Sequence, residues 1–99
     1  TLRSQVEVAG ICIDPDAHTV TVDGQEVALT PREFELLLYV AQNKNIALSR
    51  QQILSAVWNF DYYGDARTVD THVKNLRMKL GNHGSALKTV RGRGYKLEG

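Results

Sequence analysis

The stretch RTVDTHVKNLRMKLG, residues 67–81, decides the fold, because it has the pattern of an amphipathic helix that ends at a glycine. Its apolar residues recur every three or four positions, which is the spacing of one buried helix face. These residues are Val69, Val73, Leu76 and Leu80. Gly81 then provides a residue that readily ends a helix in the left-handed conformation. The stretch therefore predicts a helix that begins at about residue 66 and ends before Gly81.

Downstream of this helix the pattern changes to that of a short hairpin. Residues 82–85, Asn-His-Gly-Ser, are typical of a turn. The segment from Leu87 to Glu98 then indicates two strands joined by the turn Gly92-Arg93-Gly94.

Upstream, two more helices are predicted, and each begins with a capping box, in which the N-cap and third helical residues hydrogen-bond each other's backbone. The first box, Thr30-Pro31-Arg32-Glu33, has proline at the first helical position and predicts a helix over about 31–43. Its predicted apolar face is Phe34, Leu37, Leu38 and Ala41. The second box, Ser49-Arg50-Gln51-Gln52, predicts a helix that ends near Trp58. Its predicted apolar side is Ile53, Leu54, Val57 and Trp58.

The first thirty residues alternate apolar and polar positions, which is the period of half-buried strands. The alternating pairs are Val6 and Val8, Ile11 and Ile13, Val20 and Val22, and Val27 and Leu29. Asp23-Gly24, between two such runs, is a strong signal for a tight hairpin. The pattern predicts a meander of four short antiparallel strands.

In order, these elements define an α+β fold with an N-terminal four-stranded antiparallel sheet, three helices and a C-terminal β-hairpin. The last two helices and the hairpin form a winged helix-turn-helix, in which the hairpin is the wing. A chain of 99 residues with 42% hydrophobic content can bury one modest core. We therefore expect a single domain over residues 1–99.

The charges divide unevenly along the chain, although the net charge is only +1. Residues 1–65 carry four basic and nine acidic side chains, whereas residues 66–99 carry eight basic and two acidic ones. Such a split predicts one basic working face on an otherwise acidic body. The alternative is a chance clustering of solvated surface charges.

Several functional classes are disfavoured by composition. No apolar run approaches the length of a membrane span, and the N-terminus lacks the layout of a signal peptide. Cys12 is a lone cysteine, which excludes an internal disulfide framework and a multi-cysteine zinc site. We expect a cytoplasmic protein without a membrane contact, a metal or a cofactor.

The exposed side of the helix at 67–81 carries side chains suited to DNA. Opposite its apolar face lie Arg67, Thr71, Lys74, Asn75 and Met78, flanked by Asp70 and Arg77. An α-helix fits the major groove, where basic and hydroxyl groups bind phosphates and asparagine pairs with adenine. The alternative is an ordinary solvated face of an amphipathic helix.

The hairpin adds a second set of candidates. Its polar residues are Lys88, Thr89, Arg91, Arg93, Tyr95 and Lys96. An arginine at the tip of a thin hairpin can enter the minor groove, where the potential is most negative. The hydroxyls of Thr89 and Tyr95 either bind phosphates or belong to cross-strand packing, and for Tyr95 both interpretations stand equally.

Four motifs, in order along the chain, resemble the effector domain of OmpR/PhoB-type response regulators. They are Thr30–Leu37, Arg67–Val73, Leu76–Leu80 and Thr89–Tyr95. The resemblance implies a winged helix behind a four-stranded sheet and a role in bacterial transcription control. It also implies an aspartate-phosphorylated receiver domain in the full protein, which this chain does not contain.

Carried over by motif position, the resemblance implies a set of DNA contacts. On the helix these are Arg67, Thr68, Thr71, His72, Lys74, Asn75 and Arg77. On the wing they are Thr89, Arg91 and Tyr95, with Arg91 in the minor groove. Arg93 replaces a small or polar residue of the family, and either adds a second wing cation or is only solvated. Asn75 stands where several members carry arginine, which leaves the target sequence open.

Residues 59–65 match a loop through which some members of the family contact RNA polymerase. Its candidate residues are Phe60, Asp61, Tyr62 and Tyr63. The alternative is an ordinary loop with packed aromatic side chains. For Trp58, before this loop, we expect core packing.

Two other functions compete with DNA binding. An enzyme would need a catalytic or metal site, but the spacings of His18, His72 and His83 match no such template, so we predict no catalysis. A winged-helix protein-interaction module is the remaining alternative, and the basic helix and wing argue against it as the sole role. The sequence therefore predicts sequence-specific binding to double-stranded promoter DNA, as pairs on repeated half-sites about 10 bp apart.

Overall fold

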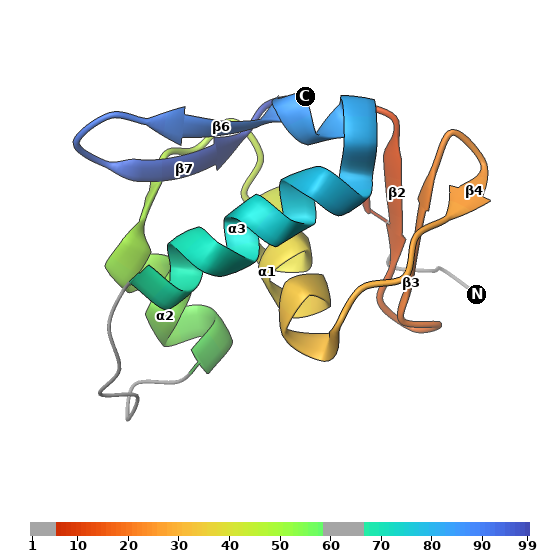
Figure 1. Ribbon diagram of the computed structural model, residues 1–99, viewed down its shortest axis with the longest axis horizontal. Coiled ribbons are helices and arrows are strands. Elements are labelled where there is room, and N and C mark those ends of the chain that lie inside the picture. Colours follow the sequence, from red (N-terminus) through yellow and green to blue (C-terminus); the bar gives the residue numbers. More distant parts are fainter. Residues whose placement is uncertain (1–5, 59–66) are drawn as a thin grey trace.

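The alternating residues near the N-terminus form the expected antiparallel meander. The computed structural model describes residues 6–58 and 67–99. Its first sheet contains β1 (Val6–Val8), β2 (Ile11–Asp14), β3 (Thr19–Val22) and β4 (Gln25–Glu26), in that order (Figure 1). Asp23 and Gly24 both have positive φ, 52° and 82°, and they join β3 to β4 as the two-residue hairpin that the sequence predicts.

The fourth strand is shorter and earlier than its apolar pair suggests. Val27 and Leu29 lie beyond β4 and are half-buried, so the prediction of a strand through them is wrong. Only Val27 still joins the sheet, because its amide donates to the carbonyl of Val20 at 2.8 Å. After it the chain leaves the sheet to reach Thr30, the N-cap of the first helix.

In the described residues three α-helices follow, and the first two begin as their capping boxes predict. They are α1 (Pro31–Gln42), α2 (Arg50–Trp58) and α3 (Arg67–Leu80). At α1 the Thr30 hydroxyl accepts from the Glu33 amide at 3.2 Å, and the Glu33 carboxylate accepts from the Thr30 amide at 3.0 Å. At α2 the same reciprocal pair joins Ser49 and Gln52, at 3.0 and 2.8 Å.

The buried face of α1 is broader than predicted. Phe34, Leu37 and Ala41 are buried as expected, but Leu36 and Val40 are fully buried as well. Leu38 is half-buried: it packs against the edge of the core and also lines a groove between α1 and α2. The broader face follows from tertiary packing. The helix α1 packs against α2, α3, β1 and the C-terminal hairpin (Figure 1), and a single narrow row of apolar side chains cannot contact all of them.

The C-terminal third ends in the predicted hairpin with two differences. A short 3-10 helix, η1 (Gly81–Ala86), replaces the simple turn that the sequence indicates. The hairpin strands β6 (Leu87–Val90) and β7 (Gly94–Leu97) are joined by β5 (Leu48–Ser49), which the sequence does not reveal, in the order β5-β7-β6. Gly94 belongs to the strand rather than the turn, and a Cβ there would lie 2.1 Å from the carbonyl oxygen of Leu48.

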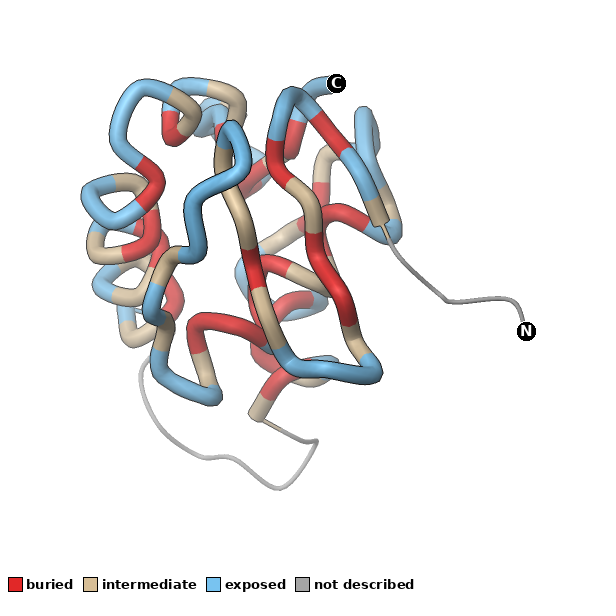
Figure 2. The backbone as a smooth tube through the Cα atoms, turned by 90° about the vertical axis from the view of Figure 1, so that its right-hand side faces the viewer, coloured by how far each residue is buried: buried red, intermediate tan, exposed pale blue. Residues whose placement is uncertain are grey.

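One core joins these parts. Buried positions alternate along the strands and fall on the inward sides of the helices, as Figure 2 shows. Ile11 and Ile13 of the sheet, Leu76 of α3 and Leu97 of the hairpin are all fully buried in it. The helix α3 and the hairpin are therefore held in a fixed relation to each other by shared packing.

Candidate nucleic-acid interface

The helix α3 turns one side to the core and the other to solvent, as its spacing predicts. Its apolar residues are at most 3% exposed: Val69, Val73, Leu76 and Leu80. On the outer side the side chains of Arg67, Thr71, Lys74 and Met78 are exposed, and those of Thr68, Asn75 and Arg77 are half-buried. The exposed stripe thus runs along α3 from its first turn to its last.

His72 lies at the margin of this face and is held by two neighbours. Its Nδ1 atom lies 2.8 Å from the carbonyl oxygen of Thr68, and its ring meets the ring of Trp58 edge-on with centroids 4.9 Å apart. The guanidinium of Arg32 lies 5.4 Å from the Trp58 ring centroid. Trp58 is half-buried and packs against the core, which agrees with the packing role expected for it.

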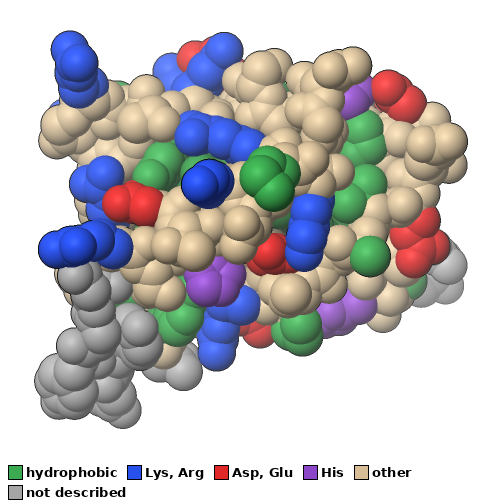
Figure 3. Space-filling view, in the orientation of Figure 1, with side chains coloured by type: hydrophobic (Ala, Val, Ile, Leu, Met, Phe, Trp, Pro, Cys, Tyr) green, Lys and Arg blue, Asp and Glu red, His purple; other side chains and the backbone are tan. Residues whose placement is uncertain are grey.

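The wing extends the same side of the molecule. Lys88, Thr89, Arg91 and Arg93 are exposed, and the last two belong to the turn between β6 and β7. Lys and Arg side chains accordingly gather over the wing and over α3 in the space-filling view (Figure 3). Lys96 is half-buried and pairs with Glu98 at 2.9 Å.

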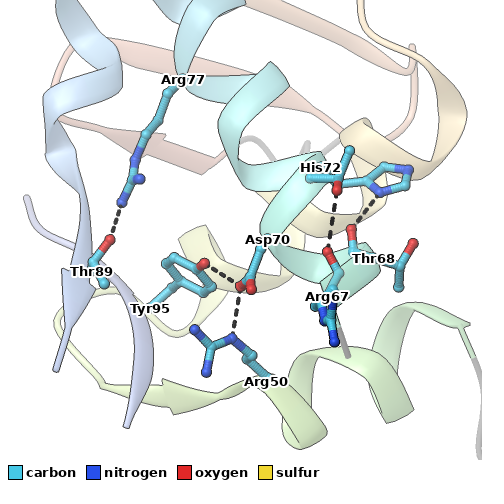
Figure 4. Close-up of polar contacts among 9 residues, drawn as sticks. Arg50, Arg67, Thr68, Asp70, His72, Arg77, Thr89 and Tyr95 are labelled. Carbon is cyan, nitrogen blue, oxygen red and sulfur yellow. Dashed lines mark hydrogen bonds and ion pairs between the residues drawn. The ribbon is translucent and has the colours of Figure 1, made fainter. Parts of the chain in front are cut away.

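Tyr95 is a candidate DNA-contact residue whose side chain is buried in the structure. It is 5% exposed, and its hydroxyl donates a hydrogen bond to the Asp70 carboxylate on α3 (Figure 4). Burial and this hydrogen bond both raise the pKa of the Tyr95 phenol. The hydroxyl of Tyr95 is therefore engaged within the chain, by a residue of α3 rather than by a residue of the opposite hairpin strand.

Asp70 is the acceptor at the centre of this contact. Besides the Tyr95 hydroxyl, it accepts from Nε of Arg50 at 2.7 Å. Partial burial acts to raise the pKa of Asp70, but the hydrogen bonds from Arg50 and Tyr95 outweigh it and hold the pKa below its ordinary value. Asp70 is therefore an ionised link between α3, the start of α2 and the wing.

Arg77 forms a second link between α3 and the wing. Its Nε donates to the carbonyl oxygen of Leu87 at 2.9 Å, and its Nη2 donates to the hydroxyl of Thr89 at 2.8 Å (Figure 4). The guanidinium carbons of Arg77 and Arg50 lie 5.6 and 5.8 Å from the centroid of the Tyr95 ring. We refer to Arg50, Asp70, Arg77 and Tyr95 as the junction cluster.

Sequence reasoning missed Arg50 in this cluster. Its partner Asp70 lies 20 positions away, and no periodicity connects a residue of one helix with a residue of another. The one available signal was that each residue lies in the first turn of a helix of the predicted helix-turn-helix. The polymerase-contact candidates Phe60, Asp61, Tyr62 and Tyr63 lie outside the described residues.

The exposed side chains described above on α3 and the wing are mainly polar and basic. In the parts of the chain that the structure describes, no three His, Cys, Asp or Glu side chains gather as metal ligands would. Within the same residues, no helix is both long and apolar enough to cross a membrane.

Comparison with known proteins shows which family shares this arrangement. Residues 24–97 match the family model described as "Transcriptional regulatory protein, C terminal". The chain belongs to this family. It is 50% identical, over 97% of its length, to the transcriptional regulatory protein SrrA of Staphylococcus aureus, and it spans 42% of the length of that relative.

Solved structures of family members have the same fold. The DNA-binding domain of Klebsiella pneumoniae RstA, in complex with the RstA box, is 30% identical with a TM-score of 0.85, over 96% of this chain and 97% of that one. The DNA-binding domain of E. coli CpxR is 33% identical with a TM-score of 0.83, over 95% of each chain. The α+β winged-helix fold and the OmpR/PhoB-type resemblance predicted from the sequence are thereby confirmed.

Proposed function

We propose that this chain binds double-stranded promoter DNA in a sequence-specific manner and thereby regulates transcription. The observation that carries the proposal is the continuous exposed stripe of α3, which lies beside a basic wing on the same side of the molecule. In this arrangement α3 enters the major groove and the wing reaches the adjacent minor groove. The RstA relative, solved in complex with its box, supports the proposal, and the family consists of transcriptional regulators rather than enzymes.

Within this proposal the side chains have different roles in DNA binding. Arg67, Thr68, His72, Lys74, Arg77 and Thr89 fix the position of the domain on phosphates. Thr71 and Asn75 read base edges in the major groove, and Arg91, accompanied by Arg93, enters the minor groove. Tyr95 acts indirectly, because its hydroxyl is engaged by Asp70.

Selection of bound duplexes from a random DNA pool tests the proposal, with the affinity of the winners followed against salt. The expected result is a repeated motif, bound with a dissociation constant that rises steeply with salt as phosphate contacts require. Absence of binding at low salt would overturn the proposal and favour a protein-interaction module. A footprint that covers one half-site at saturation would contradict the expected pairing on half-sites about 10 bp apart.

The chain spans 42% of the length of SrrA, so further expectations concern a longer protein of which this chain would be one part. We infer that a receiver domain outside this chain controls DNA binding through phosphorylation, and that the protein works in the cytoplasm, where promoter DNA is found. We also infer that Phe60, Asp61, Tyr62 and Tyr63 contact RNA polymerase. Alanine substitution of these four residues should reduce transcription while promoter affinity is unchanged, whereas a parallel loss of affinity would contradict the polymerase contact.

A further inference from the structure

Met78 lies on the outer side of α3, and the DNA contacts proposed above give it no role. It follows Lys74 by four residues and Thr71 by seven, so the three side chains fall on one side of a helix with about 3.6 residues per turn. Met78 is 69% exposed. Among the residues that the structure describes, the other exposed large apolar residue is Ile46, at 53%. Met78 is therefore an apolar side chain within the polar face that α3 turns to solvent.

The two cations beside Met78 in the sequence are engaged elsewhere in the chain. Arg77 donates to the hydroxyl of Thr89 on the wing at 2.8 Å. Lys79 donates to the buried carboxylate of Glu33, at the start of α1, at 2.6 Å. The exposed side chain between them carries no charge and no hydrogen-bond donor, so it cannot bind a phosphate as a cation would.

The proposed docking places the outer side of α3 in the major groove. The base edges in this groove present hydrogen-bond donors and acceptors, and one apolar group, the C5-methyl of thymine. An apolar side chain that faces the groove therefore favours thymine over the other bases. Burial of one methyl-sized group corresponds to a gain in affinity of roughly fourfold.

We propose that Met78 is a specificity-determining residue that contacts the C5-methyl group of a thymine in the major groove. The inference rests on the proposed function and deepens it, because it names one base of the target site. Met78 follows Asn75 by three residues, which corresponds to a rise of about 4.5 Å along the helix. Successive bases of a strand are about 3.4 Å apart, so the thymine should lie within about two base pairs of the position that Asn75 reads.

Deoxyuridine tests this contact without changing a hydrogen bond, because it differs from thymidine only in lacking the C5-methyl group. Each thymine of the selected duplex is replaced in turn, and every duplex is titrated with the unaltered chain and with Met78→Ala. Methionine and alanine are both good helix formers, and the position is exposed, so the variant should fold. Circular dichroism and thermal unfolding verify this at the binding temperature.

We expect one thymine at which deoxyuridine weakens binding by the unaltered chain about fourfold. Met78→Ala should bind the thymine and deoxyuridine duplexes alike at that position, since the interacting group is already absent. Its salt slope should equal that of the unaltered chain, because no charge is removed. Met78→Leu, which retains an apolar side chain of similar size, should keep the preference for thymine.

Two matched variants serve as controls. Ile46→Ala removes the other exposed apolar side chain, which lies after α1 and outside both DNA-binding elements, and should leave every deoxyuridine effect unchanged. Thr71→Ser removes a methyl group two turns earlier on the same side of α3 and retains the hydroxyl. The deoxyuridine effect assigned to Met78 should persist in Thr71→Ser.

Deoxyuridine effects that are the same in the unaltered chain and in Met78→Ala at every thymine would overturn the inference while the proposed function stands. A selected site without a thymine within about two base pairs of the position relaxed by Asn75→Ala would overturn it as well. Absence of any DNA binding by the unaltered chain would remove the proposed function and this inference with it.

Discussion

Lys74 and Asn75 are neighbours on α3, and their side chains predict different effects on DNA binding. Lys74 is exposed and offers a point charge, so Lys74→Ala should weaken binding to all sequences alike and lower the salt slope by about one unit. Asn75 is half-buried and offers a paired donor and acceptor, so Asn75→Ala should cost about 1–3 kcal/mol and relax one position of the site. Binding to a panel of single-base variants distinguishes the two results. A loss of affinity that is uniform across the panel for Asn75→Ala would show that Asn75 contacts the DNA backbone rather than a base.

Removal of the Tyr95 hydroxyl distinguishes a hydrogen bond within the chain from a direct contact with DNA. Tyr95→Phe retains the buried ring and removes the hydrogen bond to Asp70, so we expect a loss of about 1 kcal/mol in the free energy of unfolding. The salt slope for DNA should not change, because the hydroxyl faces a carboxylate of the same chain. Urea unfolding and binding titrations measure the two quantities. If Tyr95→Phe kept full stability but had a reduced salt slope, the hydroxyl would be assigned to a direct phosphate contact instead.

The start of α1 is joined to α3 by Glu33, a 3% exposed carboxylate. It completes the capping box with Thr30 and accepts from Lys79 at 2.6 Å. Burial acts to raise the pKa of Glu33, but the hydrogen bonds from Lys79 and Thr30 outweigh it and lower the pKa below the ordinary 4.5. Because the folded-state pKa is depressed, this contribution to stability is present above pH 4.5 and lost as the pH falls through the folded value.

Two substitutions at Glu33 distinguish the stability contributed by the helix cap from that contributed by the charge. Glu33→Gln can still close the capping box, so it should mainly flatten the decline of stability below pH 4.5. Glu33→Ala also removes the reciprocal cap and should cost about 1 kcal/mol more at neutral pH. Urea unfolding over a range of pH measures both. An unchanged acid profile for Glu33→Gln would show that the pair with Lys79 contributes nothing to it.

Elements whose signals are local could be predicted, and those that depend on distant partners could not. Thr30 and Ser49 cap the helices that their own boxes define, and the Asp23-Gly24 hairpin needs only two residues. By contrast, β5 has two residues, too few for alternation, and exists because Leu48 and Ser49 pair with β7. Burial of Leu36 and Val40 and the pairing of Arg50 with Asp70 likewise depend on the assembled fold.

At the scale of the whole molecule, the N-terminal sheet is attached to the C-terminal third by more than core packing. His83 of η1 lies between two acceptors of the sheet, the carbonyl oxygen of Ala9 at 2.9 Å from Nδ1 and the carboxylate of Asp23 at 2.8 Å from Nε2. An imidazole can donate to both only when it carries two protons. The sheet and the segment that leads into the wing are therefore joined by a contact that favours the charged histidine.

This contact predicts a pH dependence with a definite direction. The hydrogen bond to Asp23, and then the one to Ala9, raises the pKa of His83 above its ordinary 6.5. A raised folded-state pKa contributes stability that is full below pH 6.5 and is lost as the pH rises through the folded value. His83→Gln should therefore lower the Tm more at about pH 5.5 than at about pH 9. Asp23→Asn should show the same trend, and the double variant should lose less than the two single losses combined, because both substitutions remove one contact. Thermal unfolding at the two pH values measures this, and a Tm loss that is equal at both would show that the link between sheet and η1 does not depend on the histidine charge.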